Sequence, residues 1–158
     1  MAPKFVFVMR HAEKCDDKTL SLDLSPGGQR RAEKLASYIP ATFGAPNFIF
    51  AAANSNHSAR PFDTVKPLAA SIGVPINATI SDHDYEVLAH ELLNNQCYVN
   101  AKVLVCWHHG NIPSLMHALG AKSGEYPDPW DRNVFNLILK LDYSSSGTPS
   151  LAKINEPF

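Results

Sequence analysis

The sequence predicts an α/β domain with a central, mostly parallel β-sheet and helices on both faces of that sheet. Residues 5–9 are all apolar and residues 102–107 are apolar after Lys102, which is typical of strands buried on both faces. Segments with apolar residues at helical spacing lie between such runs. This alternation indicates βαβ units, which build a three-layer sandwich.

Each strand is predicted from a short apolar run that ends at polar or turn-forming residues. The runs at 5–9 and 102–107 are expected at the buried centre of the sheet. The last two strands flank a segment rich in Ser, Gly and Pro and are expected to form a hairpin. The strands are expected at residues 5–9, 47–51, 74–80, 102–107, 134–141 and 150–154.

Each helix is predicted from apolar spacing and from residues that start or stop helices. Ser25 can be the N-cap of the first helix and Pro26 its first residue, and Pro40 is expected to stop that helix. Gly73 is expected to close the second helix, and Pro113 suits the first turn of the last. The helices are expected at residues 26–39, 62–72, 84–93 and 112–119.

The composition restricts the class of protein. The chain has 158 residues, which suits one domain over 1–158, and no repeat or linker is visible. Its 14 Lys and Arg residues nearly balance 15 Asp and Glu residues, so a net charge of -1 gives no reason to expect nucleic acid or an anionic membrane as a partner. Three cysteines without metal-ligand spacing, and no recognisable signal peptide or membrane span, lead us to expect a cytoplasmic protein.

Cationic side chains and imidazoles follow three of the predicted strands. Arg10 and His11 end the first strand, Arg60 lies between the second strand and its helix, and His108 follows the fourth. Because the carboxyl ends of parallel strands open on one side of a sheet, these side chains can converge in one crevice. Two guanidinium groups and two imidazoles suit a phosphate dianion, and a neutral imidazole can attack phosphorus to form a phosphohistidine. No metal or other cofactor is expected.

Four segments of the chain together match a known pattern. They are Val8-Met9-Arg10-His11-Ala12-Glu13, Leu24-Ser25-Pro26-Gly27-Gly28-Gln29, Arg60-Pro61-Phe62-Asp63-Thr64 and Val103-Leu104-Val105-Cys106-Trp107-His108. They resemble, in order, the Arg-His-Gly/Ala signature, the stretch before the first helix, the second-arginine motif and the strand before the second histidine of the histidine phosphatase superfamily, also called phosphoglycerate-mutase-like. Because all four occur in the family's order, the resemblance is specific and covers nearly the whole chain.

The resemblance implies a phosphoglycerate-mutase-like fold and a phosphoric monoester hydrolase in which His11 attacks phosphorus. It also implies that Arg10, Arg60 and His108 hold the equatorial phosphate oxygens. His11 must be neutral to attack while His108 helps as a cation, so we expect the rate to fall in acid as His11 becomes protonated. The chain departs from the family where His109 stands in place of the usual glycine, which makes His109 the rival of His108.

The residue that donates a proton to the leaving oxygen has three candidates. Members of the family with a separate acid usually place a Glu after the second arginine, and Glu86 is the nearest match, with Asp82 and Asp84 as alternatives. All three carboxylates also suit the start of a helix, where acidic groups are favoured. A metal cluster of the same aspartates with the histidines at 83, 108 and 109 is a further alternative, although adjacent histidines on a strand point in opposite directions.

The segment between Arg60 and His108 is too short for the large lid of the sugar-phosphate mutases. The chain therefore resembles the compact members, some of which remove phosphate from phosphohistidine on proteins. We expect a metal-independent phosphatase whose partner is a phosphorylated small molecule or a phosphoprotein. The alternative is a non-catalytic module that binds a phosphorylated ligand in the same pocket, because no proton donor is certain.

Overall fold

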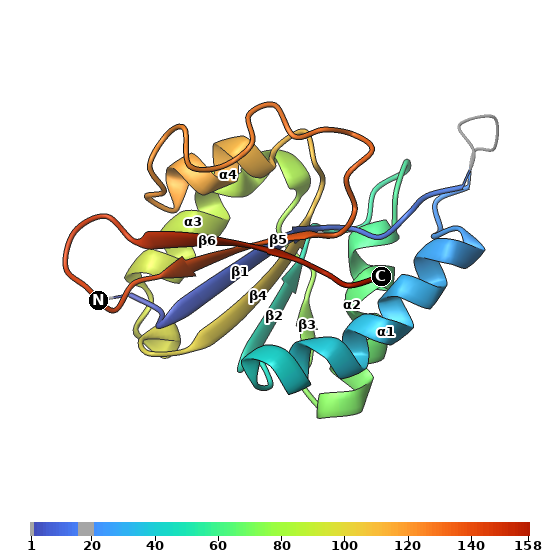
Figure 1. The fold of residues 1–158 in the computed structure, drawn as a ribbon, viewed down its shortest axis with the longest axis horizontal. Coiled ribbons are helices and arrows are strands. Elements are labelled where there is room, and N and C mark those ends of the chain that lie inside the picture. The colour runs from blue at the N-terminus through green and yellow to red at the C-terminus, as the bar shows by residue number, and fades with distance from the viewer. Residues whose placement is uncertain (1, 16–20) are drawn as a thin grey trace.

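The computed structural model describes residues 2–15 and 21–158, and its centre is a six-stranded sheet with the order β3-β2-β4-β1-β5-β6 (Figure 1). The strands β1 to β4 pair in parallel, and β5 runs antiparallel to both β1 and β6. The prediction of a mostly parallel sheet is confirmed. The strands are β1 (Phe5–Arg10), β2 (Phe48–Ala51), β3 (Ile76–Asn77), β4 (Lys102–Trp107), β5 (Leu137–Asp142) and β6 (Ser150–Asn155).

The helices cover both faces of the sheet, as predicted (Figure 1). On one face lie α1 (Pro26–Phe43) and α2 (Arg60–Ile72), and on the other lie α3 (Tyr85–Asn94) and α4 (Ile112–Ala118). Short 3-10 turns, η1 (Asp82–Asp84) and η2 (Gln96–Tyr98), flank α3. No helix among the described residues is long and apolar enough to cross a membrane.

The two central strands are buried because both of their faces meet helices. In β1, Val6 and Val8 pack on the α3 and α4 side, while Phe7 and Met9 pack on the α1 and α2 side. Since residues alternate between the faces of a strand, only a continuous apolar run can fill both cores. The parallel register pairs Arg10 with Trp107 and so brings the carboxyl ends of β1 and β4 together.

The prediction that Pro40 stops the first helix is wrong. The helix continues for a further turn to Phe43, and Gly44, at a φ of +81°, donates its N–H to the Pro40 carbonyl. Proline lacks the N–H that would bond within the helix, but near the end of α1 this removes a single hydrogen bond. The ring of Phe43 packs 4.8 Å from that of Phe7, which favours the extra turn.

Three other elements differ from the prediction. The third strand is reduced to Ile76–Asn77, since Pro75 cannot donate to a neighbouring strand. The fifth strand begins at Leu137, because Val134 closes a turn by donating its N–H to the carbonyl of Asp131. In the third helix the apolar residues at helical spacing include Val87, but Val87 does not belong to the buried face, because it is 57% exposed.

Candidate active site

The carboxyl ends of β1, β2 and β4 lead to a pocket of about 460 Å³. Arg10 is the last residue of β1, His108 follows β4 directly, and Arg60 is the first residue of α2. Together with His11, all of these side chains line the pocket, which we call the His11 pocket. The sheet therefore assembles in one place the residues that the sequence analysis selected from strand ends.

The ring of His11 is fixed in a state suited to nucleophilic attack. Only 2% of His11 is exposed, and its Nδ1 lies 2.7 Å from the carbonyl oxygen of Ala12. A carbonyl oxygen only accepts, so Nδ1 donates and the lone pair of the neutral ring lies on Nε2. Burial, assisted by the charge of Arg10, lowers the pKa of His11 to about 3. The ring is therefore neutral at physiological pH.

The guanidinium of Arg10 is held rigidly at the edge of the pocket. Its Nη1 donates to the carbonyl of Arg132, and its central carbon lies 3.9 Å from the centre of the Phe135 ring. Arg10 is only 3% exposed, and its Nε has no hydrogen-bond partner among the described residues. Burial and the charge of Arg60 lower the pKa of Arg10 to about 10. An oxyanion in the pocket would supply an acceptor to this buried cation.

Arg60 and His108 are the other two predicted phosphate-binding residues that line the pocket. Nη1 of Arg60 donates to the Ser21 carbonyl at 3.2 Å, and its backbone N–H donates to Ser58 Oγ. The His108 ring lies 5.3 Å from the His11 ring, centre to centre. Burial lowers the pKa of His108, against the opposing effect of Asp82. Burial therefore works against the expected imidazolium at His108, and a bound phosphate dianion would work for it.

The structure separates the three candidate proton donors. Asp82 lines the His11 pocket, whereas Glu86 is exposed and lines a different cavity of about 580 Å³ between α3 and α4. Asp84 is the N-cap residue of α3, and its carboxylate accepts the hydroxyl hydrogen of Ser81 at 2.7 Å but caps no backbone N–H. Asp82 is thus the one candidate of the three that lies near His11 and His108.

Asp82 is held from two sides. Its Oδ2 accepts a hydrogen bond of 2.7 Å from Nδ2 of Asn111, and its carbonyl accepts one of 3.0 Å from the indole N–H of Trp107. Its Oδ1 is buried and has no partner among the described residues. The carboxyl group is therefore held by a hydrogen bond on one oxygen and has no hydrogen-bond partner among the described residues on the other. The 3-10 turn η1 before α3 is what turns Asp82 toward the pocket and leaves Glu86 on the far side.

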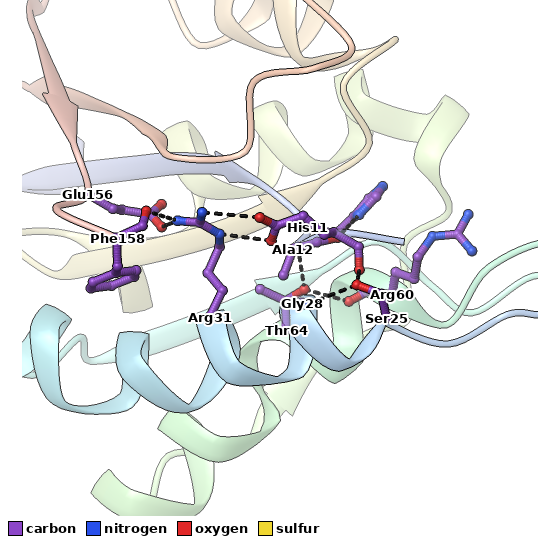
Figure 2. Close-up of polar contacts among 10 residues, drawn as sticks. His11, Ala12, Ser25, Gly28, Arg31, Arg60, Thr64, Glu156 and Phe158 are labelled. Atoms are coloured by element: carbon purple, nitrogen blue, oxygen red, sulfur yellow. Dashed lines mark hydrogen bonds and ion pairs between the residues drawn. The ribbon is translucent and has the colours of Figure 1, made fainter. Parts of the chain in front are cut away.

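Two of the motif segments hold the loop after His11 in place. The backbone N–H of Ala12 donates to Thr64 Oγ1 at 2.8 Å, and the same hydroxyl donates to the Arg60 carbonyl at 2.7 Å (Figure 2). Because one hydroxyl bridges both segments, the His11 loop and the start of α2 are joined directly. The threonine of the second-arginine motif thus has a structural role beside the arginine.

The start of α1 packs closely on the same loop. The carbonyl of Glu13 accepts the backbone N–H of Ser25 at 2.9 Å, and Ser25 Oγ accepts the N–H of Gly28 at 3.0 Å (Figure 2). A Cβ atom on Gly28 would lie 2.2 Å from the Glu13 carbonyl oxygen. Only glycine permits this approach, so the Ser-Pro-Gly-Gly segment is needed to seat α1 against the His11 loop.

A partly buried ion-pair network lies on the other side of the loop and was not predicted from the sequence. Arg31 contacts Glu13 at 2.9 Å and Glu156 at 2.8 Å, and it also donates to the Phe158 carbonyl (Figure 2). Glu156 is 4% exposed, and burial raises its pKa to about 7. Burial also raises the pKa of Glu13, but the bonds from Arg31 outweigh it and the net shift is downward. No local pattern links residues so distant in sequence.

Other polar residues of the pocket come from loops. His109, the rival of His108, also lines it, and burial and the charge of Arg10 lower the pKa of His109. His57 and His83 line it as well. Among the described residues no three His, Cys, Asp or Glu side chains are grouped so as to hold a metal ion. The alternative metal cluster at this site is therefore not assembled.

Comparison with known proteins identifies the fold. No family model and no curated protein matches the sequence. Among solved structures, one from Agrobacterium tumefaciens, assigned as the phosphohistidine phosphatase SixA, is 20% identical, covers 96% of this chain and 97% of its own, and gives a TM-score of 0.63. A mycobacterial glucosyl-3-phosphoglycerate phosphatase is 13% identical, with 97% and 98% covered and a TM-score of 0.61.

Phosphoglycerate mutase from Plasmodium falciparum is a third similar structure, at 14% identity, with 98% of this chain and 91% of that chain covered and a TM-score of 0.59. The likeness extends over nearly the full length of each of these proteins. The chain therefore has the phosphoglycerate-mutase-like α/β fold, which is also the fold of the histidine phosphatases, and this prediction is confirmed. Its activity has to be argued from its own side chains.

Proposed function

We propose that the protein is a phosphatase that hydrolyses phosphomonoesters, or phosphohistidine on proteins, through a covalent phosphohistidine on His11 without a metal ion. The observation that supports this most directly is the His11 ring, which is buried, neutral and fixed with its lone pair on Nε2. It shares its pocket with Arg10, Arg60 and His108. A fixed nucleophile beside several cationic donors suits phosphoryl transfer, which depends mainly on positioning and electrostatics.

In the first step, Nε2 of His11 forms a bond to phosphorus while the bond from phosphorus to the leaving oxygen breaks. The electron pair of the broken bond stays on that oxygen, which takes up a proton. In the second step, water attacks the phosphohistidine, the nitrogen–phosphorus bond breaks, and inorganic phosphate leaves. His11 is then neutral again. Two displacements on one nucleophile replace a single slow attack by water.

Each neighbour of His11 has a role in this scheme. Arg10 and Arg60 offer N–H groups to the equatorial oxygens, whose charge is redistributed in the transition state, and the rigid seat of Arg10 on Phe135 means that little reorganisation is needed. His108, beside His11, gains a proton more readily once the phosphate is bound. Asp82 is the proposed proton donor, because it lines the same pocket and its buried Oδ1 has no hydrogen-bond partner among the described residues.

We also place the activity in the cytoplasm. Cys15, Cys97 and Cys106 are all free thiols, which suits a reducing compartment. The pocket is of a size for a phosphorylated small molecule and lies at the molecular surface, where a phosphorylated protein side chain could also enter.

Trapping of the intermediate tests the proposal. The protein is mixed with 4-nitrophenyl phosphate, denatured at alkaline pH to preserve nitrogen–phosphorus bonds, and analysed by peptide mass spectrometry. We expect one phosphoryl group on the peptide that contains His11, and none in a His11→Asn variant. Steady-state turnover should persist in excess chelator. Binding of inorganic phosphate without turnover or phosphoenzyme would instead identify the non-catalytic binding module, and loss of turnover in chelator would contradict the metal-independent scheme.

A further inference from the structure

A second cavity of about 470 Å³ adjoins the His11 pocket, with which it shares Arg10, Lys14 and His109. Its other lining residues include Arg132 and Phe135, which belong to the segment between α4 and β5. We call this cavity the Arg132 lobe. The two cavities therefore lie side by side, with these three side chains at their common boundary.

The Arg132 lobe is lined by basic groups. Three cations, Arg10, Lys14 and Arg132, and the imidazole of His109 face it, and none of its described lining residues is acidic. The chain as a whole has a net charge of -1, so this concentration of positive charge is local. Burial lowers the pKa of His109, and the nearby charges of Arg10 and Lys14 lower it further. Such a lobe would attract an anion.

Arg10 is held by the backbone carbonyl of Arg132 and not by its side chain. Arg10 donates to the backbone carbonyl of Arg132 and stacks on Phe135, so its guanidinium is fixed between the two cavities. The Arg132 guanidinium is exposed and makes no hydrogen bond or ion pair to any other described residue. The backbone of Arg132 thus supports the first site while its side chain extends over the second.

We infer that the Arg132 lobe binds a second anionic group, a carboxylate or a further phosphate, of a small phosphorylated substrate. The inference rests on the proposed function, because it takes the His11 pocket to hold the phosphoryl group that is transferred. Arg132, Lys14 and His109 would contact the second anion, and Arg10 would lie between the two. Because the cavities share three residues, both anions must lie within one small molecule's length, which favours a metabolite over an extended protein surface.

Binding measurements test the inference without requiring turnover. We would titrate 3-phosphonopropionate and propylphosphonate, which differ in the terminal carboxylate, into the protein by isothermal titration calorimetry at low salt. We expect the parent to bind the carboxylate compound about tenfold more tightly and Arg132→Gln to reduce that ratio about fivefold, since partly exposed charges interact modestly. Arg30→Gln, an exposed arginine on α1, is the matched control and should leave the ratio unchanged.

The outcomes separate this inference from the proposed function. If Arg132→Gln leaves the ratio of the two affinities unchanged, the second anion site is overturned, whether or not the protein is a phosphatase. If the ratio falls as expected but no phosphomonoester is turned over, the two-anion site stands and the phosphatase proposal fails. A phosphohistidine peptide with acidic neighbours that binds in an Arg132-dependent way, and more tightly than 3-phosphonopropionate, would overturn the assignment to a small molecule.

Discussion

Two cavities of this molecule differ more in the burial of their polar side chains than in their volume. The cavity between α3 and α4 is the larger, at about 580 Å³ against about 460 Å³ for the His11 pocket. Its carboxylates and imidazoles, among them Glu86, His90 and His117, are exposed. The His11 pocket instead contains a buried guanidinium with an unpartnered Nε and a buried imidazole of fixed tautomer. Buried polar side chains therefore identify a candidate functional site better than the volume of a cavity does.

The largest expected effect distinguishes the two cavities by their histidines. Replacing His11 by Asn removes the nucleophile, so turnover of 4-nitrophenyl phosphate should fall by at least about a thousandfold. His117→Asn alters an exposed histidine of the other cavity and should change turnover less than about twofold. Initial rates on both variants, with matched circular dichroism spectra, make the comparison. Equal losses in the two variants would contradict the contrast between the cavities.

A smaller loss is expected for an oxyanion contact. Arg60→Gln removes a charge from the His11 pocket, and the loss of one fixed donor elsewhere lowers kcat by about a hundredfold or more. The loss should appear in kcat more than in KM, because the contact strengthens in the transition state. Arg30→Gln on the exposed face of α1 is the control. Full activity of Arg60→Gln would remove Arg60 from the site.

The carboxylates sharpen the comparison further, since one lies on each cavity. Asp82→Asn should lower hydrolysis of an alkyl phosphate by about tenfold to a hundredfold, because a poor leaving oxygen needs a proton. It should affect 4-nitrophenyl phosphate much less. Glu86→Gln should leave both rates within about twofold of the parent. If Glu86→Gln shows the leaving-group dependence and Asp82→Asn does not, the donor is Glu86 and α3 must rearrange when substrate binds.

The buried network behind the His11 loop predicts a stability effect. Burial raises the pKa of Glu156 from 4.5 to about 7, so the folded state holds this proton more tightly than the unfolded state does. That contribution is fully present below pH 4.5 and is lost as the pH rises toward 7, on the order of 2–3 kcal/mol. Glu156→Gln should remove it. Urea unfolding of parent and variant at pH 4.5 and 7.5 measures the difference, and parallel pH profiles would refute it.

The smallest expected effect is that the His11 ring does not titrate between pH 7 and pH 4. Because burial lowers the pKa of His11 to about 3, its ring should stay neutral from pH 7 down to about pH 4, and acid should protonate it only below that range. The fall in the rate of hydrolysis that protonation of His11 causes is therefore expected only below about pH 4. The Cε1–H resonance of His11, assigned by comparison with His11→Asn, should not shift over pH 7 to 4. A midpoint near 6.5 would contradict the buried, neutral ring.

The parts of the fold that could be predicted are those that a local pattern specifies. Continuous apolar runs located β1 and β4, and the strand-end rule then selected Arg10, His11 and His108. Pro40 misled the prediction because a proline weakens a helix locally, while the packing of Phe43 on Phe7 depends on a strand far away in sequence. Helix propensity depends on the residues of the segment alone, whereas packing depends on the other parts of the fold that the segment contacts.

The choice of carboxylate could not be predicted for a related reason. Asp82 and Glu86 are close in sequence, but the 3-10 turn η1 and the following turn of α3 direct them to different cavities. The network of Arg31 with Glu156 joins residues 125 positions apart, and only the folded sheet places the end of β6 beside α1. Neither arrangement has a periodic signature in the sequence.

The hydroxyl of Thr64 has a consequence for how the pocket receives a ligand. It accepts from the backbone N–H of Ala12 and donates to the carbonyl of Arg60, so one hydroxyl joins two segments that are distant in sequence and holds them together. A ligand that contacts both segments would order little additional chain, because the two segments are already held together. Its binding should therefore carry a small conformational-entropy penalty. Thr64→Val would uncouple the segments, and phosphate would then have to order them itself.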